Sequence, residues 1–205
     1  MRINRTITFT TVLLAMIMIF AACGSTGSTD ESGSTTEATS PFAGMEPADL
    51  SGYDSMSDYD GESRLVETDV NEMVKLINDK ESFVVFFSFE ECPYCNAIMP
   101  YVNKAAEDAD MYVGYIDTRS NPEWTNNMEI DGYDKVVKYF GDYLPEDEDG
   151  KDHLYTPDMY FIKNGEVVAR HDGVVEGADD PTVPLTSSQE ENLMKILADD
   201  FAKLK

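Results

Sequence analysis

The spacing of apolar residues predicts four helices and four strands in the part of the chain after residue 62. Apolar positions recur at helical spacing in four segments, and apolar runs of strand length separate them. The predicted helices span about 68–77, 92–105, 133–144 and 187–201, and the predicted strands 83–89, 111–117, 158–163 and 166–171. The element order is therefore α-β-α-β-α-β-β-α.

Local signals fix several ends of these elements. Thr68-Asp69 with Glu72, and Ser187 with Glu190, have the spacing of residues that open a helix. The run 83–89 is apolar almost throughout, which predicts a strand buried on both faces. Asn164-Gly165 between two strand-like runs predicts a tight hairpin. These features together indicate an α/β domain with a sheet at its centre.

The first 22 residues have the plan of a secretory signal peptide. Two arginines precede an apolar stretch that is densest over 12–22, shorter than the roughly 20 residues of a membrane-spanning helix. Two alanines directly before Cys23 resemble the lipobox of bacterial lipoproteins, which implies that Cys23 is diacylated after cleavage. A diacylglyceryl group supplies the two chains that stable anchoring requires. The alternative is ordinary cleavage after Ala22 with a free Cys23.

Residues 23–62 are expected to form a flexible, acidic, Ser/Thr/Gly-rich tether. Residues 24–40 are almost wholly Gly, Ser, Thr, Asp and Glu, a composition that cannot bury enough apolar area to offset the entropy of ordering. Residues 41–62 add tyrosines and methionines, and we expect mostly extended linker that docks loosely. The predicted organisation is a lipoprotein signal peptide at 1–22, a tether at 23–62 and a folded domain at 63–205. The domain is then lipid-anchored to the cell membrane and faces outside the cytoplasm.

The charge balance argues against a nucleic-acid partner. Fifteen Lys and Arg against 40 Asp and Glu give the chain of 205 residues a net charge of −25. Such a chain repels a phosphate backbone, whose binding normally depends on basic side chains that displace counterions. No nucleic acid is therefore expected among its partners.

Metal and haem readings also fail on the residues present. Three cysteines are too few for an all-cysteine zinc site, and His153 and His171 are the only histidines. Attachment of c-type haem needs His after Cys95, where the chain has Asn96. The acidic run 146–152 lacks the ligand positions of an EF-hand loop. We expect no metal and no other cofactor, and the acidic run is read as a solvated loop.

Three motifs in order carry a resemblance to the thioredoxin fold. Cys92-Pro93-Tyr94-Cys95 follows the buried strand at the start of a helix, a further proline stands within that helix at Pro100, and Thr156-Pro157 opens the hairpin. The resemblance covers about 63–205. It implies a central mixed sheet flanked by helices, with Cys-x-x-Cys at a helix N-terminus and a cis-proline loop.

The resemblance also assigns roles to single residues. Cys92, at the exposed end of the helix, is expected to be the nucleophile, and Cys95, one turn in, the resolving thiol. The expected substrate groove is formed by Pro93, Tyr94, Thr156 and Pro157. Within the superfamily, residues 115–118 and the long segment before Thr156 look most like the bacteriocin transport accessory proteins.

Two positions depart from the thioredoxin pattern. The buried acid that thioredoxins carry six residues before the first cysteine is replaced here by Phe86, so the usual proton relay is absent or supplied otherwise. The tryptophan usual just before the first cysteine is replaced by Glu91. The rim of the site is therefore expected to be charged instead of apolar.

Two functions follow as hypotheses. The first is a membrane-tethered thiol-disulfide oxidoreductase outside the cytoplasm, leaning towards a reductase. Its partners would be protein disulfide or dithiol substrates, a membrane electron donor or acceptor, and the lipid bilayer through acylated Cys23. The alternative is a non-catalytic thioredoxin-like accessory lipoprotein that assists export and keeps the Cys92–Cys95 bridge as a structural element.

Overall fold

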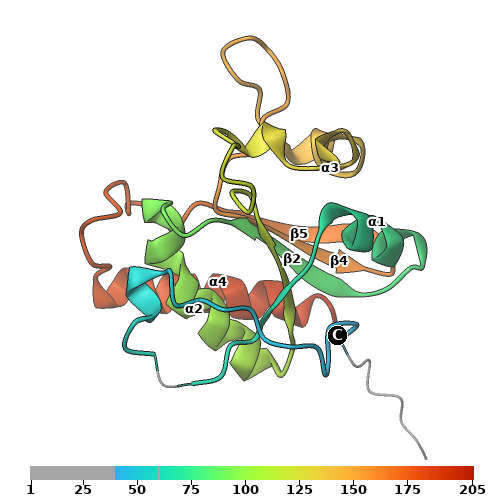
Figure 1. Ribbon diagram of the computed structural model, residues 1–205. Coiled ribbons are helices and arrows are strands. Elements are labelled where there is room, and N and C mark those ends of the chain that lie inside the picture. The colour runs from blue at the N-terminus through green and yellow to red at the C-terminus, as the bar shows by residue number, and fades with distance from the viewer. Residues whose placement is uncertain (1–39, 60) are drawn as a thin grey trace, which may run out of the picture. The chain divides into compact units, whose positions relative to one another are not determined.

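A five-stranded mixed sheet forms the centre of the protein in the computed structural model, which describes residues 40–59 and 61–205 (Figure 1). The strand order is β1-β3-β2-β4-β5, with β1, β3 and β2 parallel and β4 antiparallel to both β2 and β5. The strands are β1 (Leu65–Glu67), β2 (Phe83–Ser88), β3 (Val113–Asp117), β4 (Asp158–Lys163) and β5 (Glu166–Asp172). The expected signal peptide, Cys23 and the tether up to residue 39 lie outside the described residues.

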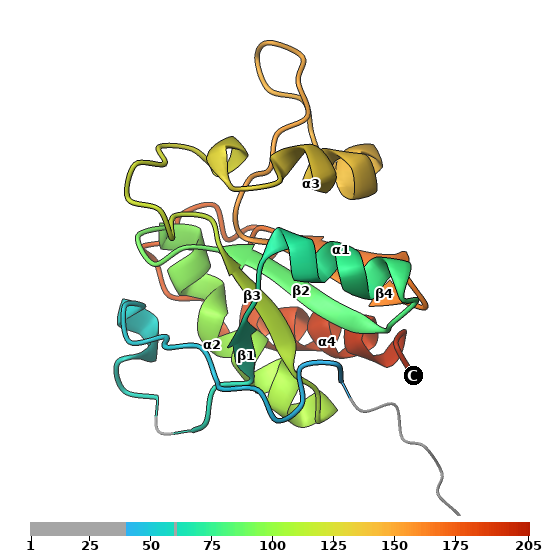
Figure 2. The ribbon, with the colours of Figure 1, turned by 45° about the vertical axis from the view of Figure 1, so that its right-hand side comes forward.

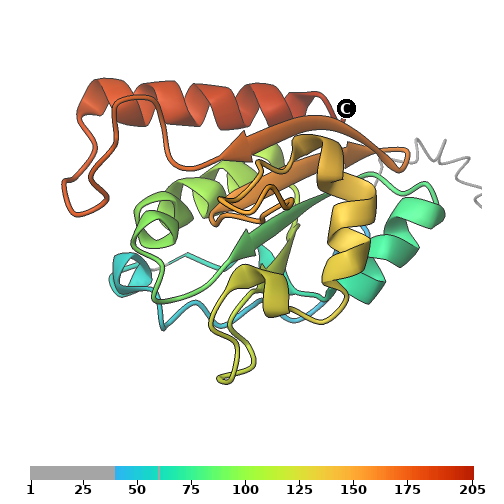
Figure 3. The ribbon, with the colours of Figure 1, turned by 90° about the horizontal axis from the view of Figure 1, so that it is seen from above.

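Two helices cover each face of the sheet (Figures 2 and 3). One face carries α1 (Val70–Asn78) and α3 (Tyr133–Phe140), and the other carries α2 (Pro93–Ala109) and α4 (Ser187–Ala202). Three short 3₁₀ turns complete the described elements: η1 (Asp54–Met56), η2 (Asn127–Glu129) and η3 (Gly141–Tyr143). Among the described residues, no helix is both long enough and apolar enough to cross a bilayer.

Strand β2 divides the core into two clusters. All six of its residues are buried, and successive side chains point to opposite faces of the sheet. Val84 and Phe86 pack under α2 and α4, whereas Val85 and Phe87 pack under α1 and α3. The continuous apolar run therefore behaves as predicted for a central strand covered on both sides.

The segment 40–59 corrects the expectation of a loosely docked linker over 41–62. Phe42, Leu50 and Tyr53 are buried in the two core clusters, and Met56 in η1 joins them. The Ala48 N–H donates to the Leu65 carbonyl at 2.7 Å, next to an isolated bridge between Pro47 and Val66. The aromatic residues of this acidic stretch are too scattered to show a period, so the sequence did not predict this packing.

Most other elements follow the expected order, with differences at their ends. Strand β1 was not predicted, because three residues are too few to show a period. Helix α4 begins at Ser187 as expected, but its capping box is formed by Thr186 and Gln189 in place of Ser187 and Glu190. The hairpin at Asn164-Gly165 is confirmed, with both residues at positive φ.

Candidate active site

The Cys-x-x-Cys motif lies where β2 passes into α2. Cys92 is the N-cap of α2 and Pro93 occupies its first turn, a position where proline loses no helical hydrogen bond. The Cys95 N–H donates to Sγ of Cys92 at 3.1 Å. Sγ thus takes the place of a capping oxygen and lies at the positive end of the helix dipole, which favours a thiolate.

Cys92 and Cys95 form a disulfide in this structure, with their Cα atoms 5.1 Å apart. The Cys92 side chain is 4% exposed and Cys95 is completely buried. Cys92 is thus less open than a helix end suggests. Of the two cysteines, Cys92 is the one with some exposed surface, and the nucleophilic and resolving roles stay predictions.

The loop before β4 covers Cys92. The Thr156–Pro157 peptide bond is cis, as the resemblance implies. The carbonyl oxygen of Thr156 lies 3.7 Å from Sγ of Cys92, and the Thr156 hydroxyl lies 3.9 Å from the same sulfur. Residues 64 positions apart in the chain therefore meet at the reactive sulfur.

The two residues between the cysteines lie at the surface. Pro93 and Tyr94 are exposed, and the Tyr94 hydroxyl donates to the Asp179 carbonyl at 2.9 Å. This bond joins the start of α2 to the segment between β5 and α4. Of the expected groove residues, Tyr94 therefore also has a contact within the fold.

Phe86 is fully buried on the same side of the sheet as the cysteine pair. A network of hydroxyl groups lies at the carboxyl end of β2. The Tyr53 hydroxyl is 2.8 Å from that of Ser88 and 2.9 Å from that of Tyr115. Burial raises the pKa of Tyr53 and of Tyr115, so both hydroxyls stay protonated. Sequence reasoning missed this network because Tyr53 was placed in the tether.

Acidic side chains surround the site on the β3 side. Partial burial, and then the nearby carboxylate of Asp117, raise the pKa of Glu90. Burial likewise raises the pKa of Asp117, a shift that the Arg119 N–H opposes and the charge of Glu91 reinforces. The expected charged rim is therefore present, and its carboxylates repel one another.

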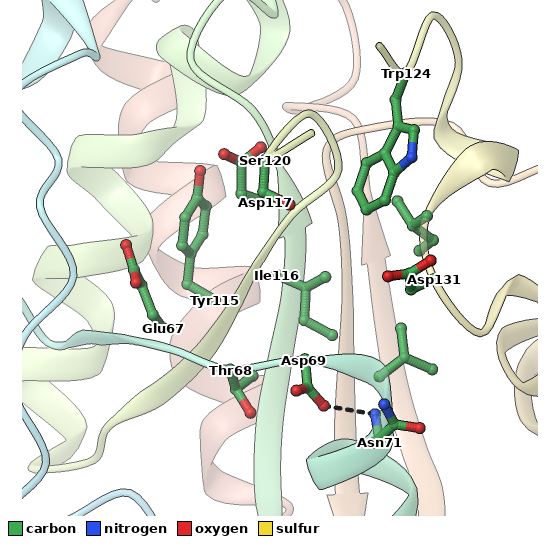
Figure 4. Close-up of a pocket in the computed structure, with 12 residues that line it drawn as sticks. Glu67, Thr68, Asp69, Asn71, Tyr115, Ile116, Asp117, Ser120, Trp124 and Asp131 are labelled. Carbon is green, nitrogen blue, oxygen red and sulfur yellow. Dashed lines mark hydrogen bonds between the residues drawn. The ribbon is translucent and has the colours of Figure 1, made fainter. Parts of the chain in front are cut away.

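A cavity of about 260 Å³ opens at the carboxyl ends of β1 and β3. Trp124 and Asp131 lie on one side of it, and Tyr115 and Glu67 lie on the other (Figure 4). Among the described residues that line it, the charged ones are all acidic. The cavity shares Asp117 with the acidic surroundings of the cysteine pair, so it extends the same negative surface.

Two of the residues considered for metals, His171 and Asp147, have other partners. His171 is buried and its Nε2 lies 2.9 Å from the Val174 carbonyl, which corrects the expectation of an ordinary surface residue. In the acidic loop, the Asp147 carboxylate accepts the N–H groups of Asp149 and Lys151 at 2.9 Å each. That carboxylate therefore closes the turn.

The buried residue Asn127 was also missed by sequence reasoning. Its side chain donates to the Leu154 carbonyl at 2.7 Å and to the Thr156 hydroxyl at 3.4 Å. A lone asparagine in a polar loop carries no sequence signal that separates it from its neighbours. Only the fold brings it beside the cis-proline loop.

Known proteins resemble part of this chain. The Thioredoxin family model matches residues 64–154. Among solved structures, thioredoxin O2 from Arabidopsis thaliana is 14% identical with a TM-score of 0.39, covering 66% of this chain and 96% of that one. Thioredoxin O1 from the same plant is 14% identical with a TM-score of 0.37, covering 65% and 97%. A search of curated proteins gave no match.

The family match covers the motif, and the structure adds the rest of the architecture. The matched residues include β2, the Cys92–Cys95 pair and β3. The mixed sheet with helices on both faces is the fold class that the sequence predicted. The described part of the chain therefore has the thioredoxin fold, with a Cys-x-x-Cys pair at the start of its second helix.

Proposed function

We propose that the protein is a thiol-disulfide oxidoreductase that exchanges disulfides with protein substrates through Cys92 and Cys95. The thioredoxin domain and the cysteine pair support this activity at the level of the fold. One observation carries the proposal furthest: Sγ of Cys92 caps a helix and contacts Thr156 beside the cis-proline. In that arrangement the Cys92 sulfur is the one that a partner would meet, and the Cys95 sulfur lies one helical turn further in.

The exchange proceeds in two displacements. The Cys92 thiolate attacks one sulfur of a substrate disulfide, that S–S bond breaks, and the leaving sulfur takes a proton. The Cys95 thiolate then attacks Sγ of Cys92 and releases the second substrate thiol. Two electrons pass to the substrate, and the protein is left with the disulfide seen in the structure.

We propose that the protein works as a reductase. The helix N-terminus stabilises a Cys92 thiolate by about 0.3–1 kcal/mol. Glu90 and Glu91 oppose it by similar amounts, since each charge at roughly 7 Å costs about 0.6 kcal/mol in a water-like dielectric. A weakly stabilised thiolate corresponds to a couple near the thioredoxin value of about −270 mV. Each cycle then needs a dithiol donor, which we assign to the membrane.

The location and finer grouping of the protein are part of the same proposal. The pattern of residues 1–22 and the alanines before Cys23 support a lipid-anchored protein outside the cytoplasm. The likeness of residues 115–118 to the bacteriocin transport accessory proteins supports a place in that group. Mass spectrometry of the membrane fraction tests the anchor: a diacylated peptide starting at Cys23 is expected, and a Cys23→Ala variant should be released.

A non-catalytic accessory role in export is the second candidate. The observation in its favour is the low exposure of Cys92, at 4%, together with Phe86 in place of the buried acid. Under this reading the disulfide only staples the start of α2.

A redox titration separates the two candidates. The full chain is equilibrated in dithiol buffers, and its reduction of a protein disulfide is compared with that of Cys92→Ser. Cys23→Ser is the matched control, because it removes the third cysteine and leaves the pair intact. A reversible couple between about −300 and −100 mV, with exchange lost only in Cys92→Ser, supports the oxidoreductase. A pair that stays oxidised below about −300 mV, or exchanges nothing, supports the accessory role.

A further inference from the structure

The side chain of Asn127 connects two loops at the active site. Asn127 lies in η2, in the segment between β3 and α3, and is 7% exposed. Its amide nitrogen donates to the Leu154 carbonyl at 2.7 Å and to Oγ1 of Thr156 at 3.4 Å. Both acceptors belong to the loop that covers Cys92. Asn127 is therefore linked to the reactive sulfur through a single intervening residue, Thr156.

The orientation of the Asn127 amide follows from its other partners. Its oxygen accepts the Thr118 hydroxyl at 2.9 Å and Nη1 of Arg119 at 3.0 Å. A guanidinium can only donate, so the amide oxygen has to face Arg119 and the NH₂ group has to face Thr156. The Arg119 guanidinium is itself held over the Phe89 ring, 4.6 Å from the centroid.

This orientation of the amide determines the direction in which the Thr156 hydroxyl can donate a hydrogen bond. Because Oγ1 of Thr156 accepts a hydrogen bond from the Asn127 amide, its own hydrogen is free to point at Sγ of Cys92, 3.9 Å away. The Cys95 N–H donates to the same sulfur at 3.1 Å. In the reduced protein both donors face a thiolate, and hydrogen bonds to a charged group are stronger than those to a neutral one.

We propose that Asn127 is a positioning residue that keeps the Thr156 hydroxyl directed at Cys92 and thereby stabilises the Cys92 thiolate. Arg119 has the supporting role of fixing the amide. The inference rests on the proposed function, because it assigns a determinant of Cys92 reactivity within that site. It also gives the site a hydroxyl donor from the loop before β4.

The test compares the pH profile of iodoacetamide alkylation of the reduced pair in full-length variants. Asn127→Leu removes the amide without adding charge, and Thr156→Val removes the hydroxyl. In each, we expect the half-maximal pH to rise by about 0.5–1 unit, a threefold to tenfold loss of rate in the acidic limb. The control is Asn192→Leu, which makes an amide-removing change at an exposed residue of α4. Its profile should match that of the wild type.

A double variant separates positioning from general damage to the loop. If Asn127 acts through Thr156, Asn127→Leu shifts the profile no further in a Thr156→Val background. An additive shift, or a wild-type profile in Asn127→Leu, overturns the inference. If Asn127→Leu does not fold, Arg119→Met frees the amide and should give a smaller shift of the same sign; no shift there overturns the inference too.

The same samples keep this inference distinct from the proposed function. If the wild-type protein exchanges disulfides and the Asn127 and Thr156 variants have the wild-type pH profile, the oxidoreductase function stands and the positioning role is wrong. If the variants show the expected alkylation shifts but the wild-type protein exchanges with no protein disulfide, the proposed function is wrong and the positioning role of Asn127 stands.

Discussion

The hydroxyl of Tyr53 lies 2.8 Å from the hydroxyl of Ser88, and this bond joins the segment before the first strand to the end of the central one. Tyr53 is fully buried and also bonds Tyr115 on β3 at 2.9 Å. Ser88 is the last residue of β2, four positions before Cys92. The strand end from which the active-site helix departs is therefore held partly by residues that precede the sheet.

Tyr53→Phe should destabilise the protein without changing its fold. The variant keeps the ring but leaves Ser88 and Tyr115 with one partner fewer in the core, which costs about 1–2 kcal/mol. Equilibrium unfolding in urea measures the loss. Tyr143→Phe, at a tyrosine that is 41% exposed, is the matched control and should stay close to the wild type. Equal stability of the Tyr53 and Tyr143 variants would contradict the role given to the buried network.

Cys95→Ala should trap the substrate. Because Cys95 is completely buried, it serves only to release a partner already bound to Cys92. Without it, the mixed disulfide on Cys92 has no internal thiol to resolve it and should accumulate on a non-reducing gel. Cys92→Ser should give no such adduct. An adduct of comparable yield in Cys92→Ser would mean that partners reach Cys95 directly.

The free energy of unfolding should decrease as the pH rises from about 4 to about 6, because Asp158 loses its proton late in the folded protein. Burial raises its pKa to about 6, although Arg170 and Tyr160 oppose the shift. In this window the unfolded chain has already lost the proton that the folded chain retains, so the contribution of Asp158 declines as pH rises. The decline is at most about 3 kcal/mol. Urea unfolding across this range should show it in the wild type and not in Asp158→Asn.

Asp172→Asn is the control for that measurement. Asp172 also pairs with Arg170, at 3.2 Å, but its side chain is 65% exposed. Its loss should leave the pH dependence of unfolding in place. A wild-type curve parallel to that of Asp158→Asn from pH 4 to pH 6 would show that Asp158 titrates with an ordinary pKa.

The acidic surroundings of the pair should select for basic substrates. Glu91 is exposed directly before Cys92, beside Glu90 and Asp117. Glu91→Lys should lower kcat/KM for a basic disulfide peptide about threefold to fivefold at low salt, and added salt should shrink the difference. Glu81→Lys makes the same charge change at the amino end of β2 and should have little effect. A loss that is independent of salt would point to a steric cause.

The sequence predicted the elements whose patterns are long or whose residues have special backbone geometry. The apolar run of β2, the Asn164-Gly165 turn and the motif at the start of α2 each determine local structure on their own. Strand β1 and the packing of Phe42 and Tyr53 depend on partners far away in the chain. Three residues or single aromatics carry no period, so their place becomes visible only in the fold.

The candidate site divides along the same line. Cys92, Cys95 and Pro157 were found because their residue types and order are specific to one arrangement of strand, helix and loop. Asn127 and Tyr53 were not found, because each acts through hydrogen bonds that form only when distant segments meet. The composition around the motif did predict the acidic rim, since Glu90 and Glu91 adjoin Cys92 in sequence.

The bridge between Pro47 and Val66 has a consequence for self-association. Strand β1 is at one edge of the sheet, and an uncovered edge offers unpaired backbone groups to a strand of another molecule. The segment around Pro47 lies along that edge, and proline has no N–H to offer to a further strand. A chain that begins at residue 63 would therefore expose β1, and it should aggregate more readily than a chain that keeps the segment around Pro47.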